Sequence, residues 1–422
     1  MSTTASIRSS PREKSENLEE KVEEVKEGGV IDGGLRAWLV IVGAVCNNAA
    51  TWGLINSWGV FQAYYETNIL PDVSPSPIAW IGSIQYALVF LPGLLVGRMF
   101  DLGYHKMPLL GASALFILAT FLTAECTQYW HFLLCQGILS CGTIYGPTMA
   151  CVPQWWNKRL GLVLGIVAVG SSIGGTVFPI VSRLLIPVVG FKWTMRILGF
   201  ILLLILGVGN LTVTRRVPPV YVPGGLWNLK AFKSKPYTLY CLSGLVAFLG
   251  LYTVLTYIAA STNVWNTSDF KSFYLVAIAN AASGVARLIF GRMSDHTGAL
   301  NLMIPTTACA AILTVAWPFA RSIGSIIIVA ILYGFASGTY ICLLVRPIIA
   351  MGDNGDVGRR LGMFTSIIAL GALTGPPISG AINHATGGYE VVGYYAGGVI
   401  LLAVGIMGLV RYLILGKMWG KI

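Results

Sequence analysis

Twelve apolar stretches of about 20 residues or more run through almost the whole of this chain. An α-helix needs about 20 apolar residues to cross the ~30 Å hydrocarbon layer of a membrane. Only 11% of the residues are charged and the mean hydropathy is +0.73, which excludes an ordinary water-soluble protein. We therefore predict an all-α integral membrane protein with twelve transmembrane helices. The stretches lie at 37–65, 78–96, 107–125, 129–152, 160–186, 193–213, 237–261, 272–290, 302–320, 323–350, 361–382 and 391–415.

The chain also repeats parts of itself. Arg-Leu-Gly at 159–161 returns 201 residues later at 360–362, and Gly-Arg-Met-Phe-Asp at 97–101 returns 194 residues later as Gly-Arg-Met-Ser-Asp at 291–295. The first offset also aligns two pairs of glycines, Gly170 with Gly371 and Gly174 with Gly375. Independent pairs at nearly one offset predict two pseudo-symmetric halves of six helices each.

The composition along the chain places the boundaries of these halves. Residues 1–31 are polar, with an acidic run from Glu13 to Glu27, and we predict a disordered tail there. The halves follow at 32–213 and 237–415, joined by a linker at 214–236 that is rich in proline, glycine and cations. A short C-terminal segment, 416–422, completes the chain.

The net charge of +11 is an orientation signal rather than a signal for nucleic-acid binding. Twelve Lys or Arg residues fall in the five short loops predicted on one side, at 97–106, 155–160, 214–236, 291–300 and 351–360. Only Lys192, Lys271 and Arg321 fall in the loops on the other side. Since cytoplasmic loops carry the excess of cations, both termini are predicted to be cytoplasmic.

Asn266 begins an Asn-Thr-Ser glycosylation sequon in a loop predicted to lie outside. The orientation and this sequon favour the plasma membrane, with the vacuolar membrane as the alternative. The predicted partners are the lipid bilayer and a small-molecule solute. We predict neither a cofactor nor a metal, because the cysteines lie in or beside apolar stretches without metal-ligand spacing.

The eighth apolar stretch carries the most unusual residue. Arg287 lies four residues before Gly291, about 6 Å inside the predicted helix end. Asn280 and Ser283 share its helical face at positions i and i+3, with Arg287 at i+7. An arginine at that depth is predicted to face a cavity or a partner, the alternative being that it snorkels to the inner surface. Arg346, near the inner end of the tenth stretch, is predicted to snorkel.

Other polar and aromatic residues at membrane depth are candidates for the same cavity, because an amide that faces lipid would be left without a hydrogen-bond partner. Asn56 lies in the first stretch, which is unusually rich in amides and hydroxyls. The remaining candidates are Gln85 and Tyr86 in the second stretch and Tyr257 in the seventh.

Two six-helix halves with a basic linker and repeated Gly-x-x-x-Asp turns resemble the major facilitator superfamily. Three motifs resemble its monocarboxylate porter family more narrowly. They are Asp-Gly-Gly at 32–34, Trp-Trp-Asn-Lys-Arg at 155–159, and, as in the fungal branch, Leu-Thr-Gly-Pro-Pro-Ile-Ser-Gly at 373–380. The resemblance implies a substrate site between the halves and alternating access by rocking.

The resemblance also implies roles for single residues. Arg287 matches the arginine that binds the substrate carboxylate, and Ser283 falls where animal members carry a proton-coupling aspartate. Asn56 falls on their lysine in the first helix, and Trp52 on an aromatic residue one turn earlier. The resemblance further implies that the two repeated turns control the opening and closing of the carrier. The residues of these gating turns are Gly97, Arg98 and Asp101 in the first and Gly291, Arg292 and Asp295 in the second, together with the nearby cations Lys158, Arg159, Arg359 and Arg360.

None of the seventeen carboxylates lies in the middle of an apolar stretch. A buried carboxylate is the usual proton carrier in a membrane, so proton symport of the animal type is in doubt. We predict a secondary transporter for a small organic solute, a carboxylate by preference, for which facilitated diffusion or exchange is as plausible as proton symport. The alternatives are an exporter of a fungal secondary metabolite and, from another class, a non-transporting nutrient sensor. An enzyme is not predicted, because the chain lacks nucleophile-elbow and phosphate-loop motifs.

Overall fold

The computed structural model describes residues 32–140, 143–218, 225–264, 274–352, 356–416 and 420. All the regular structure of these residues is helical. Ten helical stretches among them are long and apolar enough to cross a membrane. This agrees with the predicted all-α membrane fold.

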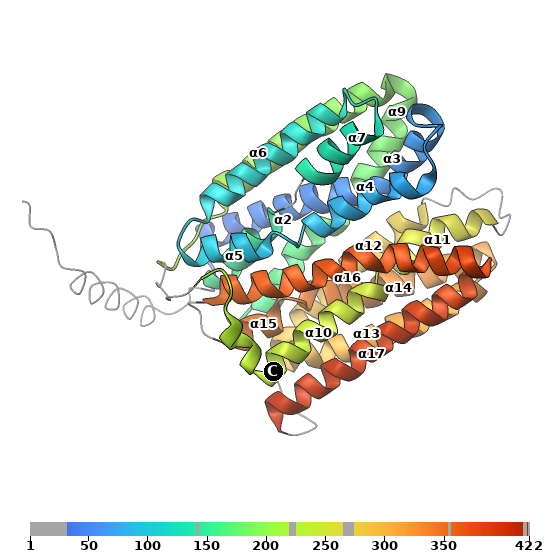
Figure 1. Ribbon diagram of the computed structural model, residues 1–422. Helices are drawn as coiled ribbons and strands as arrows, with labels where there is room; N and C mark the ends of the chain where they lie inside the picture. Colours follow the sequence, from blue (N-terminus) through green and yellow to red (C-terminus); the bar gives the residue numbers. More distant parts are fainter. Residues whose placement is uncertain are drawn as a thin grey trace, which may run out of the picture.

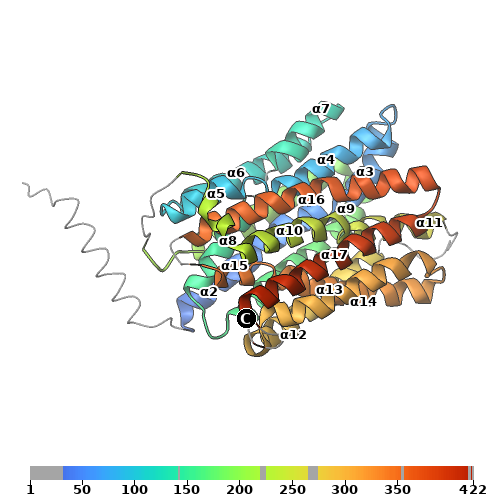
Figure 2. The same ribbon diagram turned by 60° about the horizontal axis from the view of Figure 1, so that its bottom comes forward.

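The helices form two bundles that lie side by side with their axes roughly parallel (Figures 1 and 2). The first bundle contains α2 (Leu35–Asn56), α3 (Trp58–Tyr64), η1 (Tyr65–Ile69), α4 (Pro75–Leu88), α5 (Gly93–Asp101), α6 (Lys106–Thr123), α7 (Tyr129–Phe132), η2 (Leu133–Leu139), α8 (Tyr145–Cys151), η3 (Val152–Gln154) and α9 (Leu160–Thr212). After η4 (Leu229–Lys233), the second bundle contains α10 (Lys235–Gly250), α11 (Thr253–Val264), α12 (Tyr274–Thr297), α13 (Ala299–Ala316), η5 (Trp317–Phe319), α14 (Ile323–Leu343), α15 (Arg346–Ala350), α16 (Val357–Thr386) and α17 (Tyr389–Leu415). The bundles meet where α9 packs on α12 and α5 packs on α16.

Helix α9 differs from the two separate stretches predicted at 160–186 and 193–213. Its 53 residues would measure about 80 Å if straight, far more than a bilayer. The backbone is non-helical at Gly190, where φ is 78°, so the element is two helices joined at a kink. Most of the predicted loop at 186–192 is therefore helical, and one glycine with positive φ makes the turn.

Several membrane helices are interrupted near their middle. Ser57 separates α2 from α3, and Leu251 and Tyr252 separate α10 from α11. The two interruptions do not fall at corresponding points of the bundles, because the 201-residue offset pairs Ser57 with Ile258 and Leu251 with Ala50.

Glycines hold α9 close to α2 in the first bundle and α16 close to α10 in the second. A Cβ atom added to Gly174 would lie 2.1 Å from the carbonyl oxygen of Ala49 in α2. One added to Gly375, at the aligned position, would lie 2.6 Å from the carbonyl oxygen of Leu249 in α10. The glycines four residues earlier in each helix approach the same partners in the same way. This confirms that the glycines permit close helix packing.

Candidate functional site

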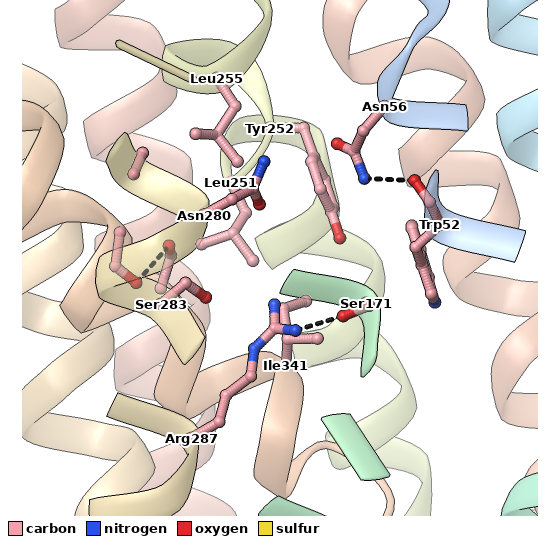
Figure 3. A pocket seen from close by; sticks show the side chains of 13 residues that line it. Trp52, Asn56, Ser171, Leu251, Tyr252, Leu255, Asn280, Ser283, Arg287 and Ile341 are labelled. Atoms are coloured by element: carbon pink, nitrogen blue, oxygen red, sulfur yellow. Dashed lines mark hydrogen bonds between the residues drawn. The ribbon is translucent and has the colours of Figure 1, made fainter. Parts of the chain in front are cut away.

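A small cavity lies where the two bundles face each other (Figure 3). The cavity volume is about 30 Å³, enough for about two water molecules. The first bundle contributes Trp52, Asn56 and Ser171 to the lining. The second contributes Leu251, Tyr252, Leu255, Ala279, Asn280, Ser283, Arg287, Gly334, Ser337 and Ile341.

Arg287 of α12 points its guanidinium group toward this cavity (Figure 3). Only 6% of the residue is exposed. Its Nη1 donates to the carbonyl oxygen of Ala168, at 2.6 Å, and to the hydroxyl oxygen of Ser171, while Nε has no hydrogen-bond partner. Among the described residues, no carboxylate oxygen forms an ion pair with it within 4 Å. A buried cation with only neutral partners favours an anion in its cavity.

The other two predicted residues of α12 line the cavity as well. Asn280 donates from Nδ2 to the carbonyl oxygen of Gly175 in α9, at 3.2 Å, and so reaches across to the first bundle. Ser283 is buried in the wall between Asn280 and Arg287. One face of α12 therefore presents an amide, a hydroxyl and a guanidinium to the same space.

Trp52 and Asn56 complete the wall from α2. The Asn56 side chain donates to the carbonyl oxygen of Trp52 at 2.7 Å, which satisfies a backbone acceptor near the end of the helix. The Trp52 ring lies edge-on to Tyr86 of α4, with ring centroids 5.7 Å apart. Tyr86 thus stands behind the cavity wall rather than in it.

Gln85 and Tyr257 are not among the lining residues. Gln85 is completely buried in α4, and neither polar atom of its amide has a hydrogen-bond partner. The Tyr257 hydroxyl donates to the carbonyl oxygen of Pro376 at 2.8 Å and so joins α11 to α16. In this structure Tyr257 therefore contacts α16 and does not line the cavity, where we predicted it.

Sequence reasoning missed Tyr252 and Ser171 as lining residues. The 201-residue offset would have come within one residue of Tyr252, because it aligns Trp52 with Thr253. Ser171 could have been noticed because Ser171 and Ser172 form a polar pair in an otherwise apolar part of α9.

The end of the bundles that carries the cation-rich loops, here called the basic end, is closed by two aspartates. Asp295 at the end of α12 accepts hydrogen bonds from the backbone N–H groups of Gly161 and Leu162, at 2.7 and 3.0 Å. These groups begin α9 and have no partner within the helix. Arg346 donates to Asp295 at 2.9 Å. The prediction that Arg346 snorkels is wrong, because this ion pair holds it.

Asp101 makes the matching contact from the first bundle. Its carboxylate accepts hydrogen bonds from the N–H groups of Gly358 and Arg359, both at 2.9 Å, at the start of α16. The Arg359 Nε atom lies 3.4 Å from the same carboxylate. Each repeated turn therefore caps the repeated Arg-Leu-Gly helix of the opposite bundle, where the helix dipole favours a negative charge.

The other predicted gating residues surround these two caps. The backbone N–H of Lys158 donates to Asp32 at 3.0 Å, and Arg360 pairs with Asp356 at 2.7 Å. Arg98 is buried, whereas Arg159 and Arg292 are exposed. Gly97 and Gly291 lie at the contact between the bundles, against Gly358 and Gly161. Asn266 lies outside the described residues.

Replacing Asp101 or Asp295 by Ala should slow turnover about fivefold to thirtyfold, with a change in KM of less than about twofold. Loss of a helix cap costs about 1–2 kcal/mol, which here destabilises the conformation closed at the basic end. Transport rates at several solute concentrations measure the effect, and Asp72→Ala in an exposed loop is the control. Unchanged turnover in both variants would show that the caps serve folding only.

The fold and the cavity define a membrane carrier of two facing bundles, and comparison with known proteins gives its family. The Major Facilitator Superfamily model matches residues 37–348. The chain is 35% identical to the fujikurins efflux protein of Gibberella fujikuroi, over 90% of this chain and 83% of that protein. It is 34% identical to the aspyridones efflux protein of Emericella nidulans, over 88% of this chain and 76% of that protein. The chain belongs to the Major Facilitator Superfamily.

A solved structure shows the same fold. The crystal structure of the human organic anion transporter MFSD10 superposes with a TM-score of 0.69, covering 89% of this chain and all of that one. Its sequence identity to this chain is 16%, so the likeness concerns the fold.

Proposed function

We propose that this carrier exports an organic metabolite by alternating access, with the cavity of Figure 3 as its substrate site. The observation that carries the proposal is the buried Arg287, which faces a cavity between two bundles without a carboxylate partner among the described residues. Two relatives that match most of the chain are named as efflux proteins, which supports export. Export of a metabolite was the alternative in our sequence interpretation, and we now propose it ahead of uptake of a carboxylate.

The lining supports an anionic solute with an apolar or aromatic body. Arg287 is the single charged residue in the described lining, and Trp52, Tyr252 and four aliphatic side chains supply the apolar surface. A carboxylate, or another acidic group of similar size, would accept from the guanidinium in two-pronged geometry. The proposed solutes are therefore organic anions in general, and the predicted carboxylate is one of them.

The proposal includes transport without proton coupling. The described lining contains no Asp or Glu, and Ser283 stands where the resemblance expects the coupling acid. Without a titrating carboxylate in the cavity, facilitated diffusion or exchange is the expected mode.

The proposed topology has twelve spans, with the basic end and both termini in the cytoplasm. Ten helical stretches of the described residues are long and apolar enough to cross the membrane. Helix α9 is one of them and counts as two spans, because it turns at Gly190. The interrupted stretch 129–151 adds one more span, which gives twelve. The halves are proposed at 32–213 and 237–415, with 1–31, 214–236 and 416–422 as tail, linker and C-terminal segment. The plasma membrane and membership of the monocarboxylate porter branch remain part of the proposal.

The second candidate is uptake of a carboxylate, which the same arginine would serve, since the fold does not fix the direction of flux. A nutrient sensor is a weaker candidate, because a signalling protein would need a sizeable cytoplasmic segment and the linker is short.

The test is solute flux through proteoliposomes that contain the purified full-length protein. A panel of acidic aromatic metabolites, simple monocarboxylates, dicarboxylates and flavins is loaded inside, each acid beside its uncharged methyl ester or amide where one exists. We expect at least one acid to leave about tenfold faster than from protein-free liposomes, its neutral analogue not to, and a proton gradient to change neither rate. Equal rates with and without protein for the whole panel would contradict the proposal. Accumulation driven by the gradient would contradict its uncoupled form.

A further inference from the structure

The contacts of Arg287 connect the two bundles to each other. Arg287 belongs to α12, whereas the Ala168 carbonyl and the Ser171 hydroxyl that it contacts belong to α9. Figure 3 shows the guanidinium group reaching from the wall of the second bundle to Ser171 on the first. The same group that faces the cavity therefore also ties the two bundles together.

This tie lies in the middle of a continuous contact between α9 and α12. Toward the basic end, a Cβ atom added to Gly165 would lie 2.4 Å from the carbonyl oxygen of Arg287. Toward the other end, a Cβ added to Gly284 would lie 3.2 Å from the Cβ of Ser172. The helices are thus in direct contact on both sides of the tie, through the Arg287 backbone and the Ser172 side chain. They cannot separate here unless Arg287 releases Ser171 and the Ala168 carbonyl.

The partners of Arg287 on α9 are electrically neutral. A hydroxyl and a carbonyl are weaker acceptors for a guanidinium than a carboxylate, and Nε remains without a partner. An anion that enters the cavity can offer both of its oxygens to the guanidinium. It therefore competes directly with Ser171 for the same N–H group.

We propose that Ser171 is a positioning residue that takes the place of the substrate's anionic group in the empty carrier. When an anion binds, Arg287 leaves Ser171, the tie between α9 and α12 is weakened to the contact with the Ala168 carbonyl, and the bundles separate more readily. The inference rests on the role of Arg287 in the proposed function. Its consequence is that the empty carrier reorients slowly and the loaded carrier quickly, which favours exchange over net flux.

The closing contact at the basic end supplies a local measurement of this tie. The N–H groups of Gly161 and Leu162 are bonded to Asp295 across the bundles, so they exchange with solvent when the bundles separate there. Hydrogen exchange of the peptide containing these residues is measured on the full-length protein without any solute. We expect Ser171→Ala to raise its exchange rate about tenfold to a hundredfold, the effect of losing one hydrogen bond to a charged group.

Ser172→Ala is the matched control, because Ser172 is the next residue, is buried, and has a hydroxyl without a hydrogen-bond partner. Ser171→Thr keeps a hydroxyl oxygen and should restore the slow exchange. Equal exchange rates in Ser171→Ala and Ser172→Ala would overturn the proposal. So would a Thr variant as fast as the Ala variant.

Benzoate and benzamide test the competition by an anion in the unmodified protein. The two molecules have nearly the same shape, but only benzoate carries a charge. We expect millimolar benzoate to raise the exchange rate at Gly161 and Leu162 at least about twofold and benzamide to leave it unchanged, with the benzoate effect strongly reduced in Ser171→Ala. Equal effects of the two molecules would overturn the proposal. Because this readout needs no transported solute, its failure can be told apart from failure of the export proposal.

Discussion

Replacing Arg287 by Ala is expected to reduce the flux of an anionic solute at least about 100-fold, while the protein still folds and reaches the membrane. The solute would lose its only charged partner in the described lining. Removing one member of a buried charged pair costs about 3–5 kcal/mol, and about 1.4 kcal/mol corresponds to a factor of ten. The flux assay in proteoliposomes measures the loss.

Two further variants show whether charge or geometry matters. Arg287→Lys keeps the charge but loses the two-pronged guanidinium, so we expect it to recover only a small part of the flux. Arg36→Ala removes an exposed arginine near the start of α2 and should leave the flux unchanged. Normal flux in a well-folded Arg287→Ala protein would show that the cavity in Figure 3 is not the substrate site.

Replacing Gly97 by Leu is expected to abolish turnover by keeping the basic end open. A Cβ atom at this position would lie 2.1 Å from the backbone oxygen of Gly358, so α5 and α16 would have to move apart. Separation of these helices would also break the contact of Asp101 with the start of α16, which lies one turn away. A carrier that cannot close one end cannot complete a cycle of alternating access, so flux should fall at least about 100-fold.

Gly111→Leu on α6 is the matched control for this substitution, because a Cβ added there meets no atom within 4 Å. Hydrogen exchange of the Gly358 and Arg359 amides reports opening at the basic end, and both amides should exchange faster in Gly97→Leu only. Wild-type flux or unchanged exchange in Gly97→Leu would mean that α5 and α16 tolerate the added volume without separating.

Much of the fold followed from local patterns in the sequence. A stretch of about 20 apolar residues can satisfy its backbone hydrogen bonds in a membrane only as a helix, and helical periodicity then places Asn280, Ser283 and Arg287 on one face. The cavity lining contains all three. The repeat offset likewise predicted corresponding glycines, and these meet corresponding partners in the two bundles.

Tertiary structure alone decided which of these local features meet. Asp101 contacts Gly358, a residue 257 positions away, and Arg346 pairs with Asp295 where an isolated helix would have left it to snorkel. Tyr252 reaches the cavity, whereas the hydroxyl of Tyr257, five residues further on, bonds to Pro376 of α16. Hydropathy and periodicity describe a helix by itself, and so they determined where the chain crosses the membrane and which faces are polar. The partner of each polar face depends on how the two bundles pack, and no pattern within one stretch contains that information.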